Sequence, residues 1–182
     1  MYNAYLSSQI FNHLMNGKVI NKTKLNNNSQ FVENPLFIEI IENLDDYKTQ
    51  YQMNGVDLVV TVDYVYIKER GLKNDNLKTD ITMKTCLLLL LLGKYITENN
   101  FRMSKLTEPS GGITEADIDA IMEMSDTPEI LEKAKMKNDL LPLIKSILVK
   151  RSILLEKPGA QSYILSDSGR AFYDEIIKSY QS

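Results

Sequence analysis

"NPLFIEIIENLDDYKTQYQMNGVDLVVTVDYVYIKERG", residues 34–71, passes directly from a helical to a strand pattern. In its first part, apolar side chains recur every three or four residues, and Asn34 followed by Pro35 is typical of a helix start. The second part is rich in Val, Ile and Tyr, which favour strands. The stretch therefore predicts a helix over residues 35–53 and a β-hairpin over residues 56–71, and this order decides the fold of the first half.

The patterns on either side of this stretch repeat its order of elements. A helix is expected over residues 3–15, followed by an asparagine-rich loop and a short strand. In the second half, helices are expected over 79–100 and 138–151, and "ITEADIDAIMEM", residues 113–124, opens a further helix with Thr114 and Asp117 as an approximate capping box. A hairpin over 152–165 and a closing helix capped by Ser166 or Ser168 follow. We therefore predict an α+β, mainly helical chain of two tandem winged-helix domains, each a small helical bundle with a β-hairpin wing. The expected boundaries are 1–72 for the N-terminal domain, 73–79 for a linker and 80–182 for the C-terminal domain.

The stretch "TCLLLLLLGKY", residues 85–95, lies in the expected helix 79–100 and is flanked by Lys84. A helix that spans a bilayer needs roughly 20 apolar residues, so this run is too short to be a membrane segment. A helix that is apolar on every side is surrounded by protein, and one small domain covers only part of such a cylinder. We therefore expect the run to lie between the two domains or at a homodimer interface. The expected contact residues are Leu87, Leu89, Leu90 and Tyr95.

Signatures of catalysis and of metal binding are missing from the sequence. His13 is the only histidine and Cys86 the only cysteine, so no zinc-ligand set is expected. The "SGG" at residues 110–112 lacks the lysine of a phosphate-binding loop. We expect no enzyme activity, cofactor or metal. A single cysteine and the absence of a basic, apolar leader before Lys18 favour a cytoplasmic protein without a membrane segment.

The net charge of −3 conceals an uneven distribution of charge. Eight acidic residues and no Lys or Arg lie between Glu108 and Glu132, whereas basic residues dominate from Lys133 to Lys157. Two interpretations stay open, a solvated face beside an acidic loop and a local phosphate-binding patch. Because the helix 138–151 begins with leucines after two polar residues, sequence-specific base recognition is disfavoured. The candidate residues for sequence-independent contact with double-stranded DNA are Lys137, Lys145, Lys150, Arg151 and Lys157.

Two segments resemble the MukE/MksE family, the small subunits of bacterial condensin-like SMC complexes. The first is a helix ending in "YKTQYQMNGVDLVV" followed by the aromatic strand "DYVYIKERG". The second is "LPLIKSILVKRSILLEKPGAQSYILSDSGRAF", a helix, wing and final helix in which Lys150 and Arg151 stand where the family often has paired basic residues. The resemblance spans residues 31–173 in pattern and order of elements.

This resemblance implies a non-catalytic accessory subunit with tandem winged-helix domains. Members form homodimers, bind a kleisin of the MukF/MksF type and act through it on an SMC ATPase of the MukB/MksB type. The complex acts on DNA, so a cytoplasmic, nucleoid-associated protein is expected. Chromosome organisation and segregation, or plasmid-restricting defence with a nuclease partner, both stay open. The alternative is a stand-alone winged-helix transcription regulator.

Overall fold

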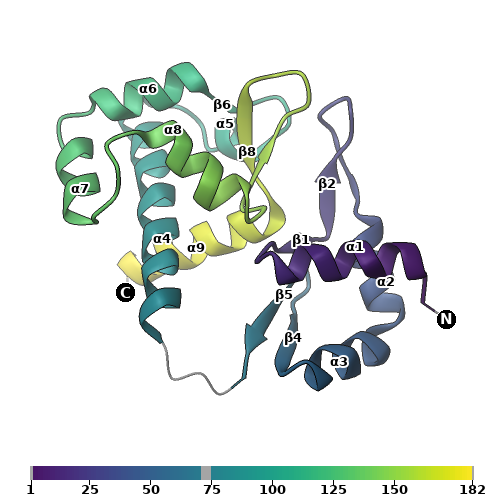
Figure 1. Ribbon diagram of the computed structural model, residues 1–182. Coiled ribbons are helices and arrows are strands. Elements are labelled where there is room, and N and C mark those ends of the chain that lie inside the picture. Colours follow the sequence, from purple (N-terminus) through teal and green to yellow (C-terminus); the bar gives the residue numbers. More distant parts are fainter. Residues whose placement is uncertain (1, 71–74, 182) are drawn as a thin grey trace.

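The computed structural model describes residues 2–70 and 75–181 and forms two halves (Figure 1). The N-terminal half consists of helices and short strands and ends in the expected hairpin. Asn34 accepts a hydrogen bond from the Leu36 N–H (3.1 Å) and Pro35 is the first helical residue, so the predicted helix start is confirmed. Its elements are α1 (Ala4–Met15), β1 (Ile20–Asn21), β2 (Thr23–Leu25), β3 (Phe31–Glu33), α2 (Pro35–Glu42), α3 (Leu44–Met53), β4 (Val56–Val60) and β5 (Tyr64–Glu69).

The C-terminal half is built around one long helix, α4, which carries the leucine run. Two predicted caps are confirmed, the Thr114–Asp117 capping box and Ser166, whose hydroxyl accepts a hydrogen bond from the Gly169 N–H. The elements of this half are α4 (Asp75–Glu98), α5 (Ser104–Thr107), β6 (Ile113–Thr114), α6 (Glu115–Glu123), α7 (Thr127–Lys133), α8 (Leu140–Leu143), the π-helix η1 (Ile144–Val149), β7 (Leu154–Glu156), β8 (Ser162–Leu165) and α9 (Asp167–Gln181).

Small antiparallel sheets accompany the helices in both halves, which confirms the α+β class. The N-terminal sheet has the order β1-β5-β4, and the C-terminal sheet has the order β6-β8-β7. In each of them the last two strands in the sequence form a hairpin, with Leu58 opposite Ile67 in one and Leu155 opposite Ile164 in the other. A further hairpin, β2–β3, projects beside the β7–β8 hairpin (Figure 1).

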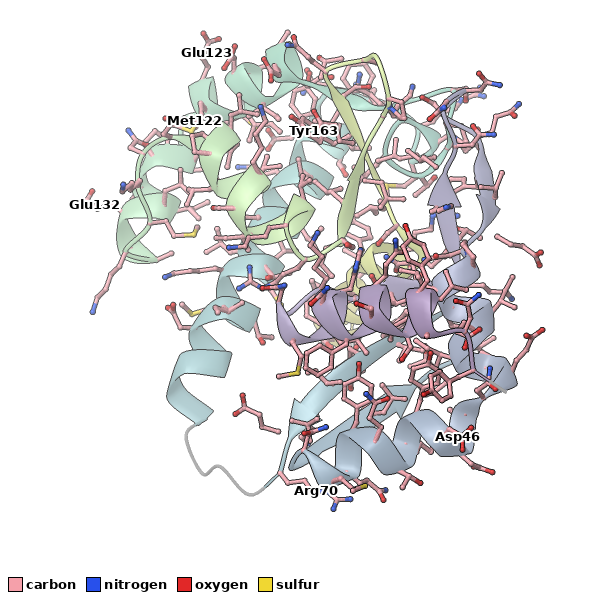
Figure 2. The ribbon with its side chains drawn as sticks, turned by 45° about the vertical axis from the view of Figure 1, so that its right-hand side comes forward. Asp46, Arg70, Met122, Glu123, Glu132 and Tyr163 are labelled. Carbon is pink, nitrogen blue, oxygen red and sulfur yellow. The ribbon has the colours of Figure 1, made fainter. Side chains whose placement is uncertain are left out.

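Each half has its own hydrophobic core. The N-terminal core joins α1, α2, α3 and the β4–β5 hairpin, with Ile10, Ile40 and Tyr51 at its centre. The C-terminal core surrounds α4 and includes Tyr163 of β8, which lies inside this half in Figure 2. Glu123 and Glu132, from the acidic segment, lie at its periphery in the same view.

The local structure differs from the expectation in three places. The helix predicted over 35–53 is two helices, because the backbone of Asn43 leaves the helical conformation and lets α2 and α3 both turn apolar faces to one core. The helix 138–151 contains the wide turns of η1, in which the Lys150 N–H donates to the Lys145 carbonyl. Residues 75–79 of the expected linker belong to α4, whereas residues 71–74 lie outside the described part of the chain.

Candidate interaction surfaces

The leucine run is mostly buried within the C-terminal half itself. Leu88, Leu89, Leu91 and Leu92 have at most 3% of their surface exposed, and the buried members of their core cluster all come from this half. Helices α6 and α9 and the π-helix η1 pack against α4 and cover the run. One half therefore covers most of the cylinder, and the contact with a second domain or chain that the sequence predicts can involve only the outward-facing members of the run.

The four expected contact residues separate into two groups. Leu89 is fully buried, and Tyr95 is 7% exposed with its hydroxyl donating to Asp117 Oδ1 at 2.7 Å. A second chain cannot reach either residue while the C-terminal core is intact, so the contact role predicted for these two is corrected to a core role. Leu87 and Leu90 are only partly buried and face outward from the same helix.

Asp117 organises the polar part of this core. Its carboxylate accepts hydrogen bonds from the Thr114 N–H (2.8 Å) and the Tyr95 hydroxyl, and Lys105 Nζ lies 3.0 Å away. Burial by itself raises the pKa of the Asp117 carboxyl, but these hydrogen bonds outweigh it and lower the pKa. Burial and the hydrogen bond to Asp117 raise the pKa of Tyr95 to about 12. This arrangement ties α4 to the start of α6 and is structural.

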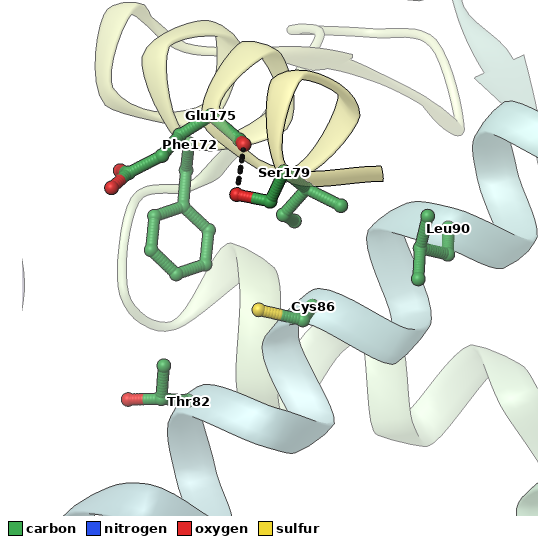
Figure 3. A pocket seen from close by; sticks show the side chains of 7 residues that line it. Thr82, Cys86, Leu90, Phe172, Glu175 and Ser179 are labelled. Carbon is green, nitrogen blue, oxygen red and sulfur yellow. Dashed lines mark hydrogen bonds between the residues drawn. The ribbon is translucent and has the colours of Figure 1, made fainter. Parts of the chain in front are cut away.

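A groove in the C-terminal half lies between α4 and α9 (Figure 3). Its volume is about 430 Å³, and its lining is mainly apolar. Figure 3 shows Thr82, Cys86 and Leu90 along one face of α4, opposite Phe172 and Ser179 of α9. The lining residues are Thr82, Cys86, Leu90, Phe172, Glu175, Ile176 and Ser179.

This groove continues into a cavity of about 530 Å³ between the two halves. Thr82, Phe172 and Glu175 line both spaces, and the N-terminal half contributes Tyr64 and Tyr66 to the second. Burial raises the pKa of the Cys86 thiol, and the nearby Glu175 carboxylate adds to this shift. The thiol is therefore protonated at neutral pH and is a weak nucleophile, which fits an apolar contact surface.

The five candidate DNA-contacting cations do not all present free charges. Lys145 Nζ lies 3.2 Å from Glu115 Oε1, and this hydrogen bond, with a contribution from the Tyr163 hydroxyl, raises the pKa of Lys145. The Arg151 guanidinium donates to the carbonyl of Ser146 (3.3 Å) at the end of η1. Lys157 Nζ donates to the Gly111 carbonyl at 2.8 Å. Lys137 and Lys150 are exposed.

The Arg151 guanidinium therefore contacts the carbonyls of η1, as cations at helix C-termini commonly do. The structure brings Lys145, Lys150 and Arg151 together around η1. Lys157 lies at the β7–β8 turn and Lys137 precedes α8, so these two flank the others on separate segments. A DNA phosphate that binds here would meet the exposed Lys137 and Lys150, whereas the other three cations already have partners within the protein.

Sequence reasoning missed the polar contacts that join the two halves. Asn21 is 3% exposed; its side chain donates to the Ser152 carbonyl (2.9 Å) and accepts from the Ser168 N–H (2.8 Å). The Asp167 carboxylate accepts from both the N–H (2.7 Å) and the hydroxyl of Thr23. The serine-rich start of the closing helix indicates a cap, but no local sequence pattern predicts that Asn21 accepts a hydrogen bond from the Ser168 N–H of this helix.

Neither a cluster of metal-ligating side chains nor a helix long and apolar enough to span a membrane is found in the described residues. Within residues 2–70 and 75–181, no group of three or more His, Cys, Asp or Glu side chains could hold a metal ion. One nitrogen of His13 lies 2.9 Å from the Gln9 carbonyl of its own helix. Over the same residues, every helix is too short or too polar to cross a bilayer.

Comparison with known families identifies the chain. No curated protein matches it significantly. The family model described as condensin complex protein MksE matches residues 5–177, from α1 to α9. The match includes the β4–β5 and β7–β8 hairpins, the leucine run and every residue that lines the groove between α4 and α9 except Ser179. The chain therefore belongs to the MksE family of condensin complex proteins.

Proposed function

We propose that this protein is a non-catalytic accessory subunit of a bacterial condensin-like SMC complex, cytoplasmic and nucleoid-associated. In this role it binds the kleisin as a homodimer and contributes sequence-independent contacts to double-stranded DNA. The match of the MksE family model over residues 5–177 carries the proposal. The order of elements supports two winged-helix units, since each half places helices before a hairpin in a three-stranded antiparallel sheet.

Copurification tests the kleisin contact directly. The tagged chain is coexpressed with the kleisin-like and SMC-like proteins encoded beside its gene, and the complex is isolated at physiological salt. We expect the kleisin to copurify and the SMC ATPase to follow only when the kleisin is present. A folded chain that binds neither protein would contradict the proposal. A nuclease gene in the same neighbourhood would favour plasmid-restricting defence over chromosome organisation and segregation.

The groove between α4 and α9 supports the homodimer part of the proposal. Leu90 and Ile176 line it, and Leu87 is partly buried on the same helix. Met83 is 47% exposed, lies two turns before Leu90 on the same face of α4, and extends the apolar surface along this helix. An unpartnered apolar surface on a helix is covered most simply by a second copy of the same helix. Light scattering after size exclusion gives the mass that tests this part.

The DNA contact rests on the cations around η1 and the β7–β8 turn. Lys150 and Lys137 are exposed, and the carboxylate partner of Lys145 can exchange for a phosphate. Such contacts depend on salt and not on base sequence. The alternative, a stand-alone transcription regulator, requires strong preference for one operator at the same salt concentration. Helix α8 begins with Leu140 and Leu141, which offer no hydrogen bonds to base edges.

A further inference from the structure

A second apolar surface lies on the outer side of α2 in the N-terminal half. Ile38 and Ile41 are 36% and 43% exposed and are neighbours one turn apart on this helix. With Phe37 they line a shallow cavity of about 240 Å³, whose other wall includes Lys22 and Glu33. We call this set the α2 surface; it consists of Lys22, Glu33, Phe37, Ile38, Ile41 and Glu42.

The fold of the N-terminal half does not need this surface for its own core. Helix α2 already buries Leu36, Phe37 and Ile40 on its inner face, against α1, β1 and α3. Single exposed apolar residues are common, but two adjacent isoleucines at the edge of a hollow are characteristic of a contact site. Ile38 and Ile41 therefore add little to folding and are available to a partner.

The charge around the α2 surface indicates the kind of partner. Glu33 and Glu42 line the cavity, and the exposed Asp46 at the start of α3 projects from the same half (Figure 2). In the part of the chain that the structure describes, neither glutamate has a salt-bridge partner. Lys22, the one cation of the lining, lies 4.0 Å from Asp63. An apolar centre with a negative rim complements an apolar segment flanked by Lys or Arg.

We propose that the α2 surface binds a short segment of the kleisin subunit whose apolar anchor is flanked by basic side chains. This inference rests on the proposed function and names the surface that makes the contact. The apolar anchor packs between Ile38 and Ile41, and the basic side chains pair with Glu33 and Glu42. The surface is distinct from the groove between α4 and α9, so kleisin binding and dimer formation use different halves of the chain.

Calorimetric titration of the full chain with the purified neighbouring kleisin tests the assignment. The double variant Ile38→Glu, Ile41→Glu introduces charge at exposed positions, so the chain stays folded, and circular dichroism verifies this. We expect affinity to fall at least about tenfold, the effect of losing a well-packed interface anchor. Met53→Glu is the matched control, because Met53 is 83% exposed in the same half, and we expect a change of less than about twofold.

Charge reversal tests the electrostatic part separately. Glu42→Lys is expected to weaken binding and to flatten the dependence of affinity on salt concentration, because one attractive rim charge becomes repulsive. Unchanged kleisin affinity in the double isoleucine variant would overturn the inference and leave the proposed function intact. A wild-type chain that does not bind the kleisin would overturn the proposed function itself. A double variant that loses its dimer mass while its kleisin affinity is kept would assign the surface to a second copy and also overturn the inference.

Discussion

Neighbouring leucines of α4 give the sharpest test of how the run is covered. Leu89 has no exposed surface, so Leu89→Ala removes buried carbons and leaves a closed cavity in the C-terminal core. Buried Leu→Ala substitutions lower the free energy of unfolding by about 2–5 kcal/mol. For a chain of this size, a loss of about 3 kcal/mol lowers the melting temperature by roughly 6–12 °C.

Leu90 provides the matched control, because it is one residue further along and lines the open groove. Leu90→Ala leaves no closed cavity, so the loss of unfolding free energy is expected to be about 1 kcal/mol. Lysine substitutions separate the two positions further. Leu89→Lys places an unpaired ammonium in the core and is expected to unfold the C-terminal half. Leu90→Lys leaves the fold intact and breaks the proposed homodimer.

Thermal unfolding followed by circular dichroism, at several protein concentrations, measures these stabilities. Several concentrations are needed because a dimer that binds only the folded state raises the melting temperature by mass action. Light scattering gives the mass of each variant at the same concentrations. Equal melting temperatures for Leu89→Ala and Leu90→Ala, or a stable Leu89→Lys variant, would refute the assignment of Leu89 to the core.

Three further predictions concern polar contacts. Because folding lowers the pKa of Asp117, the stabilisation of the folded state by its carboxylate is complete above the ordinary pKa near 4 and is lost as the pH falls through the pKa of the folded protein. Because folding raises the pKa of Tyr95 to about 12, the free energy of unfolding also falls between pH 10 and about 12. Tyr95→Phe is expected to cost about 1.5–3 kcal/mol at pH 7 and to flatten the alkaline limb, which denaturant titrations across pH measure. Asn21→Ala removes the partner of the buried Ser168 N–H and the shorter of the two hydrogen bonds to the Ser152 carbonyl. We expect it to cost about 2 kcal/mol, whereas an unchanged urea midpoint would show that the contact between the halves is solvated. Charge reversal at both Lys150 and Arg151 is expected to weaken DNA binding and reduce its salt slope, whereas unchanged affinity in a folded protein would leave them only as helix-terminal cations.

Signals carried by a few neighbouring residues predicted the local structure well. The Asn34-Pro35 helix start, the Thr114–Asp117 capping box and both hairpins appear as expected, because caps and turns depend on interactions within three or four residues. The strands β1, β2 and β3 were expected only as a loop with one short strand. Their stability comes from distant or tertiary contacts, such as the pairing of Ile20 with Val65, which no local pattern contains.

For the candidate contact residues, too, the sequence predicted the general character and the tertiary structure decided the role of each residue. The sequence by itself determined the class of elements, the apolar character of the leucine run and the resemblance to the MksE family. It could not assign each leucine, because a continuous apolar run has no polar face to indicate which side is covered. Only the tertiary structure decided that Leu89 and Tyr95 face the core while Leu90 lines a groove. It also decided that Arg151 donates to a carbonyl of η1 and that Asn21 forms hydrogen bonds between the halves. The physical reason is that burial and hydrogen bonding depend on segments brought together from distant parts of the chain.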